Sequence, residues 1–270
     1  MTDPNTIPLP VAASIQDHLD RIEREHGVRV LFACESGSRA WGFASPDSDF
    51  DVRFIYVHPR DWYLSIEQRR DVIEVPISDE LDIAGWDLRK ALGLMRGGNA
   101  TLVEWLGSPH VYREAAGFRD AASALANCTY RRDRSYEHYR ALATKQLAHA
   151  RVTDPVRIKK FLYALRSSLA GQWCVERAEQ PPMRLADLAD AMVLDVQERK
   201  EIDGLIKAKA TLMEKDGYAV PSDLVAALDE RLARLDAASV DRVEPASVEL
   251  FDGFLREWAS SVAVQERGAV

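Results

Sequence analysis

The sequence predicts an α+β fold followed by an all-α region. Expected strands and helices are mixed over roughly the first 110 residues, whereas from about residue 113 onward the apolar pattern is helical. A short apolar stretch at Val111-Tyr112 is the last sign of a strand. We therefore expect two domains, residues 1–112 and 113–270, with the change of character between residues 108 and 130.

In the first half, each element follows from its spacing of apolar residues. A helix with an apolar stripe from Val11 to Ile22 ends at Gly27. The expected strands, rich in β-branched and aromatic residues, are Val28–Ser36, Phe50–Val57, Val72–Ile77 and Leu81–Trp86, with a hairpin turn at Ser78-Asp79-Glu80 between the last two. Two helices follow, over residues 88–96 and over residues 99–109, the second capped by its first residue, an asparagine.

The second half reads as a helical array. Breaks are expected at Asp154-Pro155, Pro181-Pro182 and Pro221-Ser222. Between them, apolar stripes at helical spacing run over residues 158–173 and 224–235. No unit of 20–50 residues repeats, which excludes a solenoid.

The composition excludes several classes of protein. With 47% hydrophobic and 29% charged residues among 270, the chain can bury a sizeable core. No apolar run reaches the ~18 residues of a membrane span and the first residues lack a secretory signal, so we expect a cytoplasmic protein with no membrane partner. Three separated cysteines indicate neither disulfides nor a zinc site. Without GxSxG, GxxxxGK[ST] or GxGxxG, the sequence favours no hydrolase-elbow, P-loop or dinucleotide site.

The charge is unevenly distributed. The chain carries a net charge of -8, yet residues 129–166 contain ten Lys or Arg against three Asp or Glu, a local charge of +7. Four tyrosines are interleaved with this basic block. Such a block suits a phosphate-bearing partner, but it is equally typical of a solvated helix face.

Polar residues with chemical potential gather between the first two expected strands. Gly37 removes a side chain where the backbone turns, and Ser38 supplies a hydroxyl and an N–H at an expected helix start, which are phosphate-cradling features. Asp49 and Asp51 alternate within the next strand, so both carboxylates face one side. A divalent cation would relieve their repulsion, and these hard oxygens suit Mg²⁺ or Mn²⁺. Alone, such pairs more often mark turns and polar strand edges.

Asp82 strengthens the metal interpretation. It lies between Leu81 and Ile83 in an expected strand, where an unpaired charge would be costly to desolvate. If this strand lies beside Phe50–Val57, Asp82 can join Asp49 and Asp51 to hold two ions ~3.5–4 Å apart, the spacing used for in-line phosphoryl displacement.

These residues resemble the signature of the DNA polymerase β-like nucleotidyltransferase superfamily. More closely, ESGSRAWGFASPDSDFDVRFIY, with LDIAGWDLRKAL and KKFLYALR, resembles its RNA-repair-associated branch, predicted nucleotidyltransferases linked to RNA ligases. The resemblance covers at least residues 33–170. It implies a small mixed sheet with flanking helices, Mg²⁺-dependent transfer of a nucleotidyl group from an NTP, and a helical domain that closes over the nucleotide.

With that resemblance, catalytic and metal-binding roles are expected for Asp49, Asp51 and Asp82, with two Mg²⁺ or Mn²⁺ ions. Gly37, Ser38 and nearby backbone amides would hold the phosphates of the NTP, for which ATP is the expected substrate. The reaction would be in-line attack on the α-phosphorus with loss of pyrophosphate and no covalent enzyme intermediate. The basic block favours an RNA end as acceptor, and an RNA ligase is an expected partner.

Further nucleotide-binding residues are expected in the helical domain. Lys159, Tyr163 and Arg166 follow i, i+4, i+7 spacing and are expected to share a face opposite the apolar stripe. Lys159 or Lys160 would neutralise phosphates while Tyr163 packs against the base or ribose. A solvated basic face is the alternative. Arg39 fits either a phosphate ligand or an ion-pair partner of Glu35.

Two other functions keep the same site. A protein-modifying, AMP-transferring nucleotidyltransferase needs no RNA surface. A non-catalytic nucleotide- or RNA-binding scaffold for an RNA ligase needs no turnover, and the three intact carboxylates argue against it.

Overall fold

The structure is a computed structural model that describes residues 3–77, 80–152, 156–192, 194–213, 216 and 218–260. In chain order the elements are α1 (Leu9–His26), β1 (Arg29–Glu35), α2 (Gly37–Ala40), β2 (Phe50–Val57), η1 (Arg60–Leu64), β3 (Val72–Glu74), β4 (Leu81–Asp87), α3 (Leu88–Gly97), α4 (Ala100–Leu106), β5 (Val111–Glu114), α5 (Phe118–Cys128), α6 (Arg132–Ala150), α7 (Ile158–Glu176), α8 (Leu185–Ala191), α9 (Val196–Lys209), α10 (Ser222–Ala237) and α11 (Val248–Ser260).

The strands form one mixed sheet of five in the order β3-β4-β2-β1-β5. β1 runs antiparallel to β2 and β5, whereas β4 runs parallel to β2 and antiparallel to β3. The expected α+β class and small mixed sheet are confirmed. The hairpin of β3 and β4 also forms, although β3 is only three residues long and Ser78-Asp79 of its turn lie outside the described residues. The short stretch at Val111-Tyr112 is part of a strand, β5.

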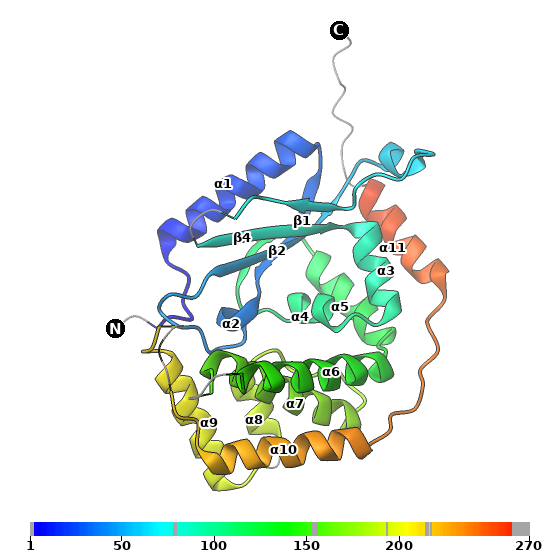
Figure 1. Cartoon of the computed structure of the whole chain (residues 1–270). Coiled ribbons are helices and arrows are strands. Elements are labelled where there is room, and N and C mark those ends of the chain that lie inside the picture. Colours follow the sequence, from blue (N-terminus) through cyan, green and yellow to red (C-terminus); the bar gives the residue numbers. More distant parts are fainter. Residues whose placement is uncertain are drawn as a thin grey trace.

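The alternation along β2 divides the sheet into two differently covered faces. Phe54 and Tyr56 point to α1, and Ile55 and Val57 point to α3, α4 and α5. Figure 1 shows α1 on one side of the sheet and α3 to α5 on the other. Gly85 of β4 allows the Phe54 ring to lie close, because a Cβ there would be 2.3 Å from the ring. Asp51 lies on the same face of β2 as Ile55, so its carboxylate is at one end of the sheet face that α3, α4 and α5 cover.

A second core is built by α6 to α10. α7 is buried along most of its length and packs closely against α6, with Leu165 and Leu169 fully buried. The expected breaks at Pro181-Pro182 and Pro221-Ser222 separate helices, while Asp154-Pro155 lies outside the described residues. In the part of the chain that the structure describes, no helix is long and apolar enough to cross a membrane.

The two cores do not divide at residue 112. Phe118 of α5 and Phe251 of α11 are buried in the cluster that covers the sheet. Conversely, Phe43 from the loop after α2 belongs to the core of α6 to α10. The chain therefore returns to the sheet with its last described helix, as Figure 1 shows for α11 beside α3.

Candidate active site

The turn after β1 brings α2 against the first carboxylate of the site. Gly37 has a positive φ of 63°, and a Cβ at this position would lie 2.1 Å from Asp51 Oδ2. The Ser36 N–H donates to the Asp51 carbonyl at 2.8 Å. A residue without a side chain is needed here for both reasons, backbone conformation and close approach.

The Ser38 side chain is buried beside α2. Its hydroxyl lies 3.3 Å from Ser48 Oγ, which also accepts from the Ser45 N–H at 2.9 Å. Ser38 is 4% exposed. Its hydroxyl therefore faces the 45–48 turn, and a phosphate at this position would have to displace a long hydrogen bond.

Asp51 and Asp82 are directly opposite each other on β2 and β4. Arg53 lies between them: its Nη2 donates to Asp51 Oδ1 at 3.0 Å and to Asp82 Oδ2 at 2.7 Å. The expected adjacency of the two strands is thus present, and the charge of Asp82 is compensated. Both carboxylates remain open to solvent, with 29% and 35% of their side chains exposed. Sequence reasoning missed Arg53, although it follows Asp51 by two residues on the same strand face.

The other acidic residues of this region have separate positions. Asp49 is exposed just before β2 begins. Glu80 is exposed before β4, and Asp87 is buried at its end, where it caps α3. Burial raises the pKa of Asp51, the charge of Arg53 opposes this, and the charges of Asp82 and Asp49 add to it.

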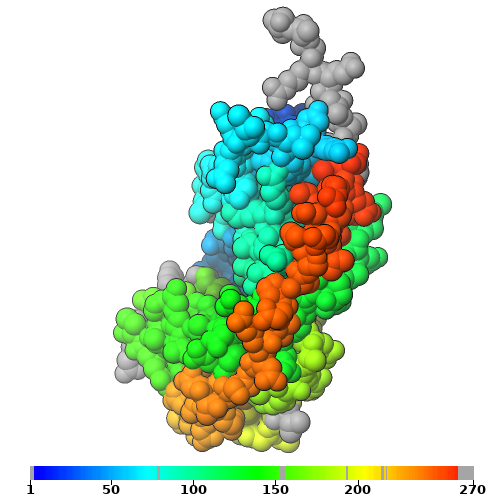
Figure 2. Space-filling model, turned by 90° about the vertical axis from the view of Figure 1, so that its right-hand side faces the viewer, coloured from blue at the N-terminus to red at the C-terminus, as the bar shows by residue number. Residues whose placement is uncertain are grey.

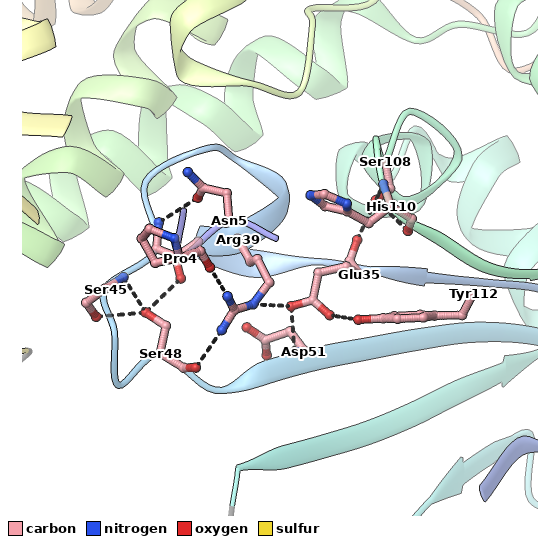
Figure 3. A network of polar contacts seen from close by, with 12 residues as sticks. Pro4, Asn5, Glu35, Arg39, Ser45, Ser48, Asp51, Ser108, His110 and Tyr112 are labelled. Carbon is pink, nitrogen blue, oxygen red and sulfur yellow. Dashed lines mark hydrogen bonds and ion pairs between the residues drawn. The ribbon is translucent and has the colours of Figure 1, made fainter. Parts of the chain in front are cut away.

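A buried network supports the backbone of Asp51 (Figure 3). Glu35, at the end of β1, accepts from the Asp51 N–H at 3.1 Å and from the Tyr112 hydroxyl at 2.5 Å. The Ser108 hydroxyl donates to the Glu35 carbonyl at 2.7 Å. Burial raises the pKa of Glu35 to about 7, while these hydrogen bonds and the charge of Arg39 oppose the rise.

Replacing Glu35 by Gln is expected to change how stability depends on pH. The folded state holds the Glu35 proton more tightly than the unfolded chain, whose carboxyl has a pKa near ~4.3. Ionisation therefore costs the wild type stability as pH rises from ~4.3 through about 7. The variant does not ionise at this position, so its free energy of unfolding should rise relative to that of the wild type by up to about 3 kcal/mol between pH 4.5 and 8. Urea unfolding across that range measures this, with the exposed Glu25→Gln as control. Parallel curves would contradict it.

Arg39 has the ion-pair role. Its Nε lies 3.7 Å from Glu35 Oε1, its Nη2 donates to the Ser48 carbonyl at 2.9 Å, and its Nη1 donates to the Pro4 carbonyl. The guanidinium also stacks 4.0 Å from the centre of the Phe50 ring and is 5% exposed. The sequence left two roles open for Arg39, a phosphate ligand and an ion-pair partner of Glu35. The structure shows the ion pair with Glu35.

Tyr163 of α7 contacts the segment that follows α2. Its ring lies 4.9 Å from Trp41 in a T-shaped arrangement and 5.8 Å from Phe43. Lys160 Nζ lies 5.5 Å from the Tyr163 ring. The charge of Lys159 lowers the pKa of Asp51, so this lysine is near enough to act on the carboxylate. The structure thus places Lys159 within electrostatic range of Asp51, and Tyr163 and Lys160 beside the segment that follows α2.

The expectation of an exposed face shared by Arg166 is wrong. Arg166 is 1% exposed, its Nη2 donates to Glu104 Oε1 at 2.8 Å, and its Nε donates to the Met183 carbonyl at 2.7 Å. Its guanidinium lies 4.6 Å from the Trp41 ring. A partner on α4, distant in sequence, turns this arginine into the core.

The carboxylates are the right kind of donor for a hard divalent cation. Arg53 bonds one oxygen each of Asp51 and Asp82 and leaves their second oxygens to other partners. Among the described residues, no group of three or more His, Cys, Asp or Glu is gathered closely enough to hold a metal ion. The carboxylate oxygens of this site thus suit a hard divalent cation, and the Arg53 guanidinium already bonds to two of the carboxylates, Asp51 and Asp82.

Replacing Arg53 by Gln is expected to tighten Mn²⁺ binding about tenfold in the absence of nucleotide. The guanidinium and the cation compete for the carboxylates of Asp51 and Asp82. Because these side chains are partly exposed, solvent screens the competing charges and keeps the expected effect modest. Calorimetric titration measures the effect. Arg113→Gln is a matched control, since Arg113, on strand β5, is equally exposed and pairs with Asp20 of helix α1. Weaker binding in Arg53→Gln would show that the guanidinium supports the cation site instead.

Comparisons with known proteins identify a family for this chain. A protein of Bacillus subtilis (strain 168) described as "Uncharacterized protein YcgL" is 41% identical over 236 residues, which cover 87% of this chain and 88% of that protein. A crystal structure of a nucleotidyltransferase-like protein from Exiguobacterium sibiricum 255-15 aligns over 83% of this chain and 73% of its own, with 11% identity and a TM-score of 0.32. Residues 11–257 match the RNA repair pathway DNA polymerase beta family. The chain belongs to this family of nucleotidyltransferases.

Proposed function

We propose that the protein transfers a nucleotidyl group from an NTP, with ATP as the expected donor, to the hydroxyl of an RNA end. The observation that carries this proposal is that Asp51 and Asp82 lie opposite each other on the neighbouring strands β2 and β4, beside Gly37. Family membership supports the reaction class and the link to RNA repair.

Each residue of the site has a distinct task in this proposal. Asp49, Asp51 and Asp82 would hold two Mg²⁺ or Mn²⁺ ions. When bound, such ions neutralise phosphate charge and lower the pKa of an attacking hydroxyl. Glu35 holds the backbone of Asp51 in place, and the absence of a side chain at Gly37 leaves the carboxylate room.

The remaining contacts would hold the nucleotide. Ser38 and neighbouring backbone amides would bind the terminal phosphates, and Lys159 would neutralise the leaving pyrophosphate, which its effect on Asp51 supports. Tyr163, packed on Trp41, would contact the nucleoside, with Lys160 beside it. The chemistry is positioning and charge neutralisation, without a covalent enzyme intermediate.

The basic block is less available to RNA than its charge indicates. At least four of its ten cations are held by carboxylates, in the pairs Arg131–Asp133, Arg140–Glu137 with Asp236, Arg151–Asp229 and Arg166–Glu104. Support for an RNA acceptor therefore comes from the family more than from this block. An RNA ligase remains the expected partner, since a modified RNA end is a natural substrate for sealing.

The test is incubation of the full chain with each α-labelled NTP, Mg²⁺ and a panel of RNAs with defined ends. Label on an RNA end supports the proposal, and the responsive RNA identifies the end. Label on a protein would replace it with the AMP-transferring alternative. Binding of nucleotide without any transfer would favour the scaffold.

A further inference from the structure

A cavity of about 470 Å³ lies at the opposite end of the sheet from Asp51. It is enclosed by η1, the following segment up to residue 71, and the first turn of α3. At ~3.3 Å per residue, the six residues from Asp51 to Val57 separate it from the carboxylates by about 20 Å along β2. Figure 2 shows the cyan segment that contains η1 at one end of this face, beside α11.

Trp62 forms an aromatic wall of the cavity. Its ring stacks on His58 with centroids 3.8 Å apart and planes 5° apart. Burial, together with the charges of Arg69 and His26, lowers the pKa of His58 to about 4, so the imidazole is neutral near pH 7. One side of Trp62 is thus fixed by a neutral ring, and the indole is held rigidly.

Two guanidinium groups flank the Trp62 ring. Arg69 lies 5.6 Å and Arg89 6.0 Å from its centroid. In the described part of the chain, neither guanidinium is paired with a carboxylate: Arg89 donates to the Tyr63 carbonyl at 3.0 Å and stacks on the Tyr63 ring. Both guanidiniums thus lie within the ~6 Å at which a cation is attracted to the face of an aromatic ring.

The acidic residues of the cavity are already engaged. Asp71 pairs with Lys90 at 3.0 Å. Asp87 accepts from the Tyr63 hydroxyl at 2.7 Å and from the Arg89 N–H at 2.8 Å. The lining thus holds three cations against three carboxylates, with Glu67 exposed, and Arg69 and Arg89 are the cations without an ion-pair partner among the described residues.

We propose that this cavity binds a nucleotide of single-stranded RNA, with its base stacked on Trp62 and its phosphate held by Arg69 and Arg89. Aromatic rings combined with cations are how single strands are bound without sequence preference. An acidic peptide would use the arginines but would gain nothing from the rigid indole. The proposal rests on the proposed function in one respect: the nucleotide belongs to the acceptor RNA, about 20 Å from the end that reacts.

The test measures the affinity of the full chain for a fluorescein-labelled 12-nucleotide RNA by anisotropy, without Mg²⁺ or NTP, at several salt concentrations. Trp62→Leu is expected to weaken binding about tenfold, and Trp62→Phe to retain most of it. Arg69→Gln with Arg89→Gln should reduce the slope of log affinity against log salt by about 0.7 for each charge removed. Arg24→Gln, an exposed arginine on α1, is the matched control and should change neither the affinity nor the slope by as much.

Transfer assays separate this proposal from the proposed function. With a dinucleotide acceptor, too short to reach the cavity, Trp62→Leu should keep the wild-type kcat and KM, whereas with the 12-nucleotide acceptor its KM should rise. Trp62-dependent RNA binding in a protein that labels no RNA would leave the cavity assignment standing and remove the proposed function. Equal RNA affinity of wild type and Trp62→Leu, or competition by an acidic peptide that is insensitive to Trp62, would overturn the assignment.

Discussion

Asp51→Asn is expected to reduce nucleotidyl transfer at least about 10³-fold while the chain stays folded. The substitution removes one anionic ligand from a site whose chemistry depends on neutralising phosphate charge, a loss of about 4 kcal/mol or more of transition-state stabilisation. Folding should be kept because asparagine still offers an oxygen to Arg53, and because repulsion from Asp82 and Asp49 disappears. Steady-state transfer and urea unfolding measure the two effects separately.

Controls for this prediction come from the same chain. Asp49→Asn should also abolish transfer if Asp49, just before β2, binds cations together with Asp51. Asp17→Asn, on the exposed face of α1, should leave the rate unchanged. A rate near that of the wild type in Asp51→Asn at saturating Mg²⁺ would remove Asp51 from the catalytic role.

Arg166→Ala is expected to destabilise the protein by about 3–5 kcal/mol. The substitution would leave Glu104, 9% exposed, as a buried carboxylate whose charge is no longer paired. The Tyr139 hydroxyl would still donate to Glu104 at 2.8 Å, but a neutral donor compensates only part of that charge. Trp41 would also lose the guanidinium beneath it, so the aromatic contact with Tyr163 should loosen.

The comparison for Arg166 is a solvent-exposed ion pair. Arg70 and Glu74 are 70% and 59% exposed, so Arg70→Ala should cost less than about 1 kcal/mol. Replacing Arg166 and Glu104 together by Met and Gln should cost less than Arg166→Ala, since no unpaired charge is then buried. Equal losses in Arg70→Ala and Arg166→Ala would show that burial does not determine the strength of the Arg166 pair.

Local periodicity predicted the strands that carry Asp51 and Asp82 but left their adjacency as a condition. The desolvation cost of Asp82 indicated that its charge needs a partner, and β2, paired with β4, provides Arg53. Strand neighbours, however, came from the expected hairpin and from the family resemblance. Nothing in the spacing alone determines the order of five strands.

Sequence reasoning did not find the contacts of side chains whose partners lie far along the chain. Arg166 was assigned to the face opposite the apolar stripe because of its spacing from Lys159 and Tyr163, but Glu104 on α4 makes its burial possible. Ser38 was expected to supply a hydroxyl at the turn, and in the structure that hydroxyl lies 3.3 Å from Ser48 Oγ, ten residues later in the chain. Arg53 was visible in the sequence, yet its role depends on Asp82 being directly opposite Asp51.

The return of α11 to the sheet affects the order in which the protein can fold during synthesis. Phe254 and Trp258 lie against Phe118 of α5, so this part of the apolar surface stays uncovered until the chain has been made as far as residue 260. At ~5–20 residues per second, the ribosome needs about 7–26 s to go from the end of α5 to the end of α11. The strands that carry Asp51 and Asp82 are thus made early, but the layer that covers them is completed last, so a nascent chain must protect this surface while the second core is still being translated.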